Sequence, residues 1–214
     1  MRKKAGFTLV EILVVISIAA ILAVIGVPQY GRFVAKNKVR GAASDLLQNM
    51  RLARTMAIKE NRPYVFNFNP GANSYTIGFD INGDNIPDGF GAAGPVRTVN
   101  LQQEYGSQVR FGTSTGAGPD QPTACPACTG IGGSTVAFGA APLVQTFNTD
   151  GTVASTGTAF FTHNRGFTYM LRITYLTGKV DLYKWDGDLA LPNPPIVNNC
   201  NASPVRYCGW TEVR

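Results

Sequence analysis

Residues 7–27 form a predominantly apolar segment that contains one charged side chain, Glu11. At about 1.5 Å of rise per residue, a helix of this length crosses the roughly 30 Å hydrocarbon core of a bilayer. A carboxylate inside lipid is costly and is by default a functional candidate that needs a partner. The pattern therefore predicts a membrane-spanning helix whose acid has a role.

Residues 28–60 have the pattern of an amphipathic helix that continues the spanning segment. Pro28 lacks a backbone donor and proline often kinks a helix, so we expect a bend or a loosened turn at residues 26–28. Asn61 and Pro63 predict that the helix ends near Glu60. The apolar positions that we expect to be buried against a sheet recur every three or four residues: Val39, Ala42, Ala43, Leu46, Met50, Ala53 and Ala57.

Short runs of alternating, β-branched and aromatic residues follow this helix and predict strands. Residues 148–151 and 177–178 are typical of turns. One long helix followed by an antiparallel sheet predicts the α+β class. The predicted strands cover residues 63–69, 74–80, 96–103, 107–111, 134–138, 144–147, 158–161, 167–175 and 179–184.

The length of 214 residues fits one domain with an anchor, and no second long apolar run is present. A formal net charge of +6 suggests nucleic acid or anionic lipid as a partner at first sight. Without Arg2, Lys3 and Lys4 the chain has 16 basic against 13 acidic side chains, an excess of only +3. By the positive-inside rule these three residues predict a cytoplasmic N-terminus and an exported remainder.

Four cysteines fall into two pairs, Cys125 with Cys128 and Cys200 with Cys208. An oxidising compartment favours disulfides, and four cysteines allow three connectivities. We expect the local bridge between Cys200 and Cys208. The first pair has the spacing of a redox motif, but it lies among glycine, proline, threonine and alanine rather than at a helix start. A structural bridge is the favoured interpretation.

The stretch from Gly6 to Glu11, with Phe7 after a basic leader, resembles the class III signal of type IV pilins and type II secretion pseudopilins. The resemblance implies that prepilin peptidase cleaves after Gly6 and that the new N-terminus, Phe7, is methylated. It also implies that Glu11 pairs with the N-terminal amine of a neighbouring subunit during assembly. A secretory signal peptide would have a shorter apolar region, and a plain anchor gives no reason for Glu11.

Residues 51–63 are similar to the LARSEAIKRN segment of GspH/FimT-type minor pseudopilins. This resemblance implies a pilin-like fold with a leader at 1–6, a transmembrane and assembly helix at 7–27 and its amphipathic continuation at 28–60. A periplasmic β-rich domain at 61–214 completes the chain. Residues 112–133 and 185–214, which hold the cysteines, depart from the family pattern.

The function that the resemblance implies is a minor pseudopilin at the tip of a short periplasmic pseudopilus, which drives protein export by type II secretion. The alternative is a minor pilin of a type IV pilus, active in pilus initiation or DNA uptake. Neither is an enzyme. The implied partners are prepilin peptidase, other minor and major pseudopilins or pilins, and the inner membrane, with the N-terminus cytoplasmic.

Asp80, Asn82, Asp84 and Asp88 are spaced like the ligands at the start of a calcium loop. The EF-hand pattern requires glycine at its sixth position and glutamate at its twelfth, and this segment has Asn85 and Gly91 there. A polar turn explains the same residues through local side-chain hydrogen bonds. Calcium binding is therefore the weaker of two interpretations.

A basic stripe near the end of the long helix, with two further arginines near the C-terminus, gives a possible contact surface for DNA phosphates. Acidic residues dilute this charge, and an ordinary solvated helix face is the commoner explanation. The basic residues concerned are Arg51, Arg54, Lys59 and Arg62, with Arg206 and Arg214.

Residues 112–116 match the nucleophile-elbow pattern around Ser114, and Asp150 and His163 follow in the order of a hydrolase. The elbow needs a strand that leads directly into a helix, and the glycine- and proline-rich residues after Ser114 do not start one. We expect a loop here, no esterase activity, and a solvated turn residue at His163.

Overall fold

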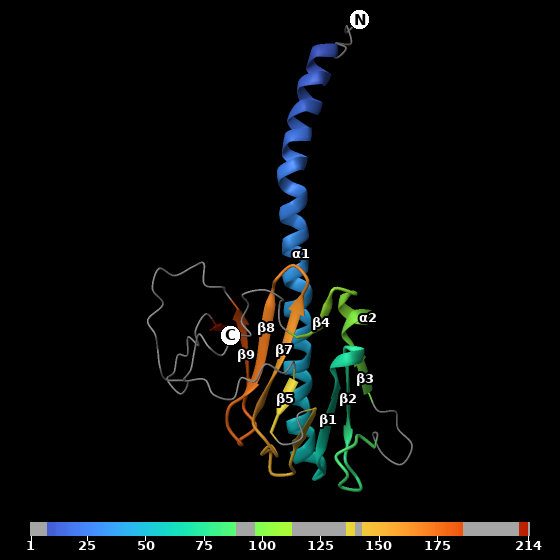
Figure 1. Ribbon diagram of the computed structural model, residues 1–214, viewed down its shortest axis with the longest axis vertical. Coiled ribbons are helices and arrows are strands. Elements are labelled where there is room, and N and C mark those ends of the chain that lie inside the picture. Colours follow the sequence, from blue (N-terminus) through green and yellow to red (C-terminus); the bar gives the residue numbers. More distant parts are fainter. Residues whose placement is uncertain (1–7, 89–96, 113–135, 140–142, 186–209, 214) are drawn as a thin grey trace, which may run out of the picture.

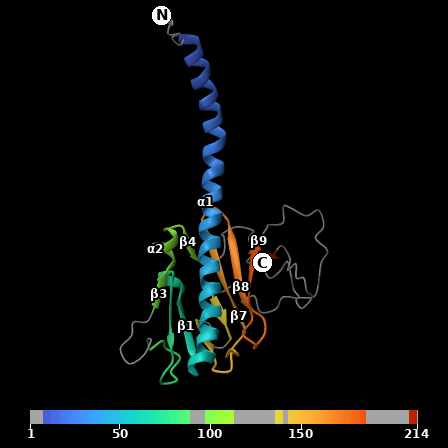
Figure 2. The ribbon, with the colours of Figure 1, turned by 180° about the vertical axis from the view of Figure 1, so that it is seen from behind.

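One helix, α1 (Leu9–Glu60), extends along the whole molecule, and two antiparallel sheets pack against its second half (Figure 1). The computed structural model describes residues 8–88, 97–112, 136–139, 143–185 and 210–213. Figure 2 shows α1 in front of both sheets, so the helix covers one face of each. The predicted α+β class and the long N-terminal helix packed on antiparallel strands are confirmed.

The sequence predicted one sheet, and the structure has two. The first contains four strands in the order β3 (Arg97–Asn100), β2 (Ser74–Phe79), β1 (Tyr64–Asn69) and β6 (Val144–Phe147). The second has the order β10 (Trp210–Glu212), β9 (Val180–Trp185), β8 (Thr168–Ile173), β7 (Gly157–His163) and β4 (Val109–Phe111), and β5 (Val136–Phe138) also pairs with β7.

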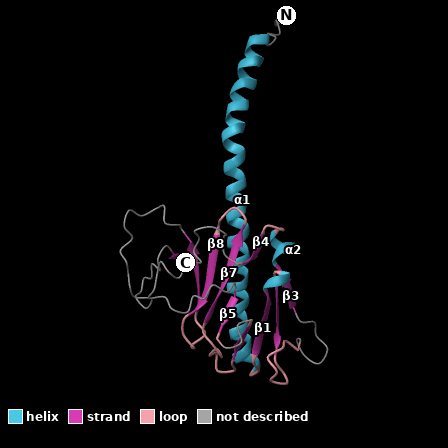
Figure 3. Cartoon of the chain, viewed as in Figure 1, coloured by secondary structure: helices cyan, strands magenta, loops and turns pink. Residues whose placement is uncertain are grey.

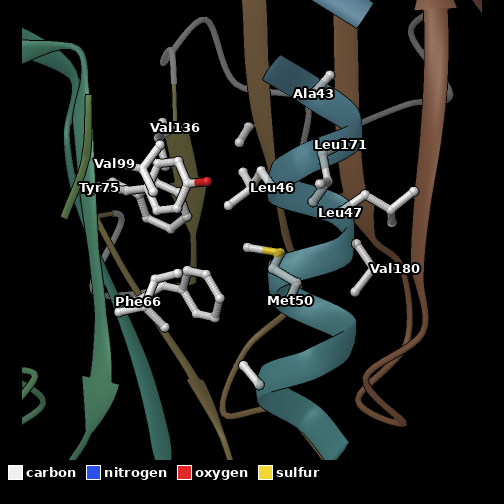
Figure 4. Packing of buried hydrophobic residues seen from close by; sticks show 14 of the residues in the cluster. Ala43, Leu46, Leu47, Met50, Phe66, Tyr75, Val99, Val136, Leu171 and Val180 are labelled. Atoms are coloured by element: carbon white, nitrogen blue, oxygen red, sulfur yellow. The ribbon is translucent and has the colours of Figure 1, made fainter. Parts of the chain in front are cut away.

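The buried face of α1 lies along the seam between the two sheets, which together form one hydrophobic core. In Figure 4, Leu46 and Met50 face Phe66 and Tyr75 of the first sheet, and Leu47 faces the second. The seven helix positions expected to be buried are each at most 1% exposed, so that prediction is confirmed.

Aromatic rings connect the sheets across the seam. The ring of Phe68 in β1 lies 5.4 Å from that of Phe138 in β5 and 5.9 Å from that of Phe111 in β4. Sequence periodicity shows which residues of a strand share a face but not which strands pair. The division into two sheets is therefore defined by strand pairing that periodicity does not reveal.

The ends of α1 follow from local chemistry. Asn61 adopts the left-handed conformation (φ 51°, ψ 44°), and its N–H donates to the Ala57 carbonyl. Asparagine tolerates this conformation better than most residues, so the predicted helix end is confirmed. The helix is continuous through Pro28 with only gentle curvature (Figure 3), so the expected loosened turn is not seen. One missing backbone donor does not interrupt a helix of 52 residues.

One predicted strand was too long. The strand expected at 96–103 ends at Asn100, because the Asn100 side chain accepts hydrogen bonds from the N–H groups of Gln102 and Gln103 and starts helix α2 (Leu101–Tyr105). A short 3-10 helix, η1 (Pro70–Ala72), forms the β1–β2 connection. The strand β10 was not predicted, and it pairs directly with β9 through Trp210 and Trp185.

The cysteine-bearing stretches lie outside the described residues, but their flanking strands fix where they leave and rejoin the second sheet. Phe111 pairs with Phe161, the Gly112 N–H donates to the Phe160 carbonyl, and Val136 pairs with Ala159. β4 and β5 therefore occupy consecutive positions along one edge of β7. Gly112 and Val136, which flank residues 113–135, therefore lie near one another on this sheet, as do Trp185 and Trp210, which flank residues 186–209.

Candidate assembly surface on the N-terminal helix

The first half of α1 exposes apolar side chains and contacts no other described element until residue 31. Leu9 is 80% exposed, Leu22 is 65% exposed and Val27 is 71% exposed, and full burial begins only at Ala35. By length and composition, α1 is the one described helix that could cross a membrane. This exposed surface needs a lipid or protein environment, because such a large apolar area is unfavourable in water.

Glu11 and Thr8 form a reciprocal capping box at the start of this helix. The Glu11 N–H donates to Thr8 Oγ1 at 3.2 Å, and the Thr8 N–H donates to Glu11 Oε2 at 3.1 Å. Two donors that a helix start leaves unsatisfied thus have partners. Our sequence reasoning missed this role of Glu11, although Thr-x-x-Glu before an apolar run is its signature. Gly6 and Phe7 lie outside the described residues.

The acidic loop after β2 does bring its carboxylates together. Oxygen atoms of Asp80, Asp84 and Asp88 lie within 4.8 Å of one another, and Asp80 is only 7% exposed. These oxygens accept hydrogen bonds from the loop itself: Asp80 from the N–H groups of Gly83 and Asn85, Asp84 from Ile86 and Asp88 from Ile81. The Asn82 side chain donates through Nδ2 to Asp84 Oδ2 and accepts through Oδ1 from the Asp84 N–H. The loop's own hydrogen bonds account for this arrangement, and calcium binding stays a prediction.

The residues of the basic stripe have different environments in the structure. Arg54 is partly buried, and its Nε donates to the Gly151 carbonyl at 2.9 Å, so this arginine ties α1 to the turn after β6. Lys59 lies 3.7 Å from the Glu60 carboxylate and both are solvent-exposed. Arg51 and Arg62 are exposed, whereas Arg206 and Arg214 lie outside the described residues. DNA contact through the stripe stays a prediction.

A polar network under α1 was not predicted. Asn49, 7% exposed, donates through Nδ2 to Asp45 Oδ2 at 3.1 Å and to the Tyr75 hydroxyl at 3.0 Å. That hydroxyl donates to Asp45 Oδ2 at 3.2 Å, and Arg97 donates to Asn49 Oδ1 at 3.2 Å. Burial, with the nearby Asp45 charge, raises the pKa of Tyr75 and raises the pKa of Tyr105 to about 12. The network joins α1 to β2, β3 and α2.

The hydrolase pattern is not assembled. Asp150 accepts from the Thr152 hydroxyl at 2.6 Å and backbone N–H at 2.9 Å, which lower its pKa. Gly151, next to Asp150, accepts a hydrogen bond from Arg54, whereas His163 is near Lys38. Arg54 and Lys38 are about 24 Å apart along α1. Asp150 and His163 are therefore at opposite ends of the domain. Ser114 lies outside the described residues.

His163 is not the solvated turn residue that we expected. It ends β7 at 6% exposure, and its Nδ1 accepts a hydrogen bond from the Arg165 N–H at 3.1 Å. Burial, followed by the positive charges of Arg165 and Lys38, lowers its pKa. The side chain stabilises the turn between β7 and β8 rather than serving as a base for Asp150.

Comparisons with known proteins agree with this architecture. The prokaryotic N-terminal methylation motif matches residues 1–27, and the family described as type II transport protein GspH matches residues 42–178. No solved structure matches the chain.

Several similar curated proteins are named as fimbrial or prepilin peptidase-dependent proteins. A fimbrial protein of Pseudomonas aeruginosa is 32% identical over 117 residues, which cover 55% of this chain and 74% of that protein. The type IV major fimbrial protein FimA of Dichelobacter nodosus is 30% identical over 106 residues (50% of this chain, 61% of the relative). Prepilin peptidase-dependent protein D of Escherichia coli K12 is 46% identical over 55 residues (26% and 35%). With the methylation motif, the GspH match and the helix-on-sheet architecture, this chain belongs to the GspH family of pilin-like proteins.

Proposed function

We propose that this protein is a minor pseudopilin of a type II secretion system that assembles at the tip of a short periplasmic pseudopilus. The observation that carries the proposal is the exposed apolar half of α1, continuous with a half that is locked into a GspH-type domain. Such a helix suits two environments in turn, first the lipid bilayer and then the helical core of a filament. The described domain supplies structure and a contact surface, and we propose no catalytic role for it.

Maturation follows from the methylation motif at residues 1–27. Prepilin peptidase cleaves after Gly6 and the new N-terminus at Phe7 is methylated. The name of the relative in Escherichia coli, a prepilin peptidase-dependent protein, supports this step. Before cleavage the precursor spans the inner membrane once, with its N-terminus in the cytoplasm and its β-rich domain in the periplasm.

Glu11 supplies the assembly contact. A carboxylate without a partner in lipid is costly, and pairing with a cationic amine favours its charged form. The N-terminal amine of a neighbouring subunit is the partner that we propose, and the pair would set the axial register of the two helices. The capping box is compatible with this role, because Thr8 and its N–H remain in the chain after cleavage at Gly6.

The cysteines would be oxidised in the periplasm. We propose a local bridge between Cys200 and Cys208, within the stretch whose flanking residues Trp185 and Trp210 are paired. Cys125 and Cys128, three positions apart in the sequence, would close a second local bridge. Mass spectrometry of non-reduced peptides would test both pairings against the two alternatives.

A type IV pilus is the second candidate setting. The fimbrial relatives in Pseudomonas aeruginosa and Dichelobacter nodosus favour it, whereas the GspH family match favours secretion. The anchor chemistry is common to both machines, so the distinction depends on the surface that meets partner subunits.

The test is a comparison of a strain lacking this gene with the complemented strain, scored for secreted proteins and for surface pili. Loss of exported cargo with pili intact supports the secretion pseudopilin. Unchanged secretion with fewer pili or failed DNA uptake rejects it in favour of a pilus minor pilin. A complementing Glu11→Ala copy should be inserted and processed yet fail to restore the phenotype.

A further inference from the structure

The end of the β-rich domain nearest the apolar half of α1 carries a group of cations, which we call the basic collar. Four are on α1, within about four turns after Val27, and the fifth is in the turn between β7 and β8. At 100° per residue, helix positions 32, 36 and 40 lie within about 80° of one another, and position 38 lies on the other side of the axis. The collar consists of Arg32, Lys36, Lys38, Arg40 and Arg165.

Tertiary structure places Arg165 in this group, although it is distant in sequence. Its guanidinium lies over Gly31, in the space that a Cβ there would fill. Figure 3 shows the β7–β8 loop beside α1 where the helix leaves the sheets. Lys38 lies about two turns after Gly31 on the same side of α1, and its Nζ lies against Gly106 at the end of α2, 3.0 Å from where a Cβ would be. Arg32, Lys36 and Arg40 thus form one stripe along α1, whereas Lys38 and Arg165 lie toward its other side.

The collar has few acidic neighbours. Between Glu11 and Asp45 the chain has no acidic residue, and Asp45 already accepts hydrogen bonds from Tyr75 and Asn49. Glu104 of α2 is the other carboxylate at this end. Within the described residues, none of the five collar cations forms a salt bridge, whereas Lys59 pairs with Glu60 and Lys179 with Asp181.

Two exposed aromatic side chains follow the apolar segment, Tyr30 before the collar and Phe33 within it. Tyr30 is 70% exposed and Phe33 is 62% exposed, and they occupy the first two turns after Val27. Aromatic residues are enriched at this depth, where a membrane meets water. Along α1 the apolar segment is therefore followed by interleaved aromatic and basic residues, which matches acyl chains followed by an interface with charged headgroups.

We propose that the basic collar docks on the anionic headgroups of the membrane that α1 spans. The headgroup layer is about 5–8 Å thick on each side, and Arg32 is about 7.5 Å beyond Val27 along the axis. Lysine and arginine side chains reach back toward the interface, so Lys36 is also within reach. Juxtamembrane basic clusters bind anionic lipid surfaces within about a Debye length.

The position of these cations supports a role in lipid contact. Basic residues close to a span on its exported side oppose the orientation that Arg2, Lys3 and Lys4 favour. Contact with lipid phosphates holds the β-rich domain upright against the bilayer before assembly, and the contact is broken when the subunit enters a filament. The inference rests on the membrane anchoring given under the proposed function.

The experiment uses the full chain in lipid vesicles of phosphatidylcholine alone or of phosphatidylcholine mixed with phosphatidylglycerol. Flotation reports whether the chain is anchored, and amide hydrogen exchange over residues 28–40 reports the collar. We expect flotation in both lipids, and exchange over 28–40 that is several-fold slower with phosphatidylglycerol at low salt. High salt should remove the difference.

Two variants test whether the lipid dependence comes from the collar or from basic residues elsewhere on α1. A variant with Arg32→Gln, Lys36→Gln and Arg40→Gln should lose the lipid dependence, while the matched Arg51→Gln, Lys59→Gln variant, farther along the same helix, should keep it. Normal flotation with equal exchange in both lipids overturns the collar and leaves the anchor intact. The same slowing produced by inorganic phosphate without anionic lipid overturns the membrane assignment. Failure to float removes the anchor and the collar together.

Discussion

Glu11 and Thr8 satisfy each other's backbone N–H groups at the first turn of α1, at 3.2 Å and 3.1 Å. The acid that we propose for assembly therefore also has a partner within its own chain. The two roles use different properties of the side chain. The cap needs a hydrogen-bond acceptor at this position, whereas pairing with a neighbour's amine needs a negative charge.

Glu11→Gln separates these roles. Glutamine can complete a capping box but carries no charge, so we expect this variant to be inserted and cleaved normally and to be excluded from filaments as strongly as Glu11→Ala. The measurement is the fraction of each variant in sheared filaments relative to its membrane pool. Incorporation of Glu11→Gln at the wild-type level would show that capping is sufficient and that the charge has no assembly role.

Tyr75→Phe tests the polar network beneath α1. The change removes a hydroxyl that accepts from Asn49 and donates to Asp45 while the ring stays buried. We expect the free energy of unfolding to fall by about 1–2 kcal/mol, since a buried polar group loses its partner. Denaturant unfolding of the full chain in detergent measures the change. Tyr30→Phe, at a 70% exposed ring, is the control and should match wild type.

Tyr105 should make stability depend on alkaline pH. Burial and the Asp45 charge raise its folded-state pKa to about 12, above the unfolded value of about 10. The fold thus favours the neutral phenol, and this contribution to stability is complete below pH ~10 and is lost as pH rises through ~12. Absorbance titration of tyrosinate should show a late step that Tyr105→Phe removes; an unchanged curve would contradict the assignment.

Arg54→Ala tests whether this arginine of the basic stripe stabilises the fold, as distinct from contacting DNA. Losing the bond from Nε to the Gly151 carbonyl should lower the free energy of unfolding by about 1–3 kcal/mol. The exposed Arg51→Ala should change it by less than about 0.5 kcal/mol. For DNA, a variant with Arg51, Lys59 and Arg62 changed to Gln should bind more weakly and with a smaller salt slope in fluorescence anisotropy. Equal stability losses in the two alanine variants would mean that the Gly151 contact is unimportant.

Local and periodic features were readable from the sequence. The apolar run at 7–27, the buried face of α1 from Val39 to Ala57 and the helix end at Asn61 depend on residues close together in the chain. Helical spacing and the left-handed preference of asparagine determine them without reference to the rest of the fold. The Thr8–Glu11 cap was equally local, and its pattern was present but not used.

Only the tertiary structure decided the features that join distant segments. Strand pairing separated the two sheets, placed β10 beside β9 and buried His163, because register depends on which strands meet and not on the alternation within each one. The Asp45–Asn49–Tyr75 network, the Arg54–Gly151 bond and the position of Arg165 over Gly31 each unite residues 26 or more positions apart. Sequence thus determined the anchor and the helix, whereas packing decided which polar side chains became structural and which cations stayed free to meet a partner.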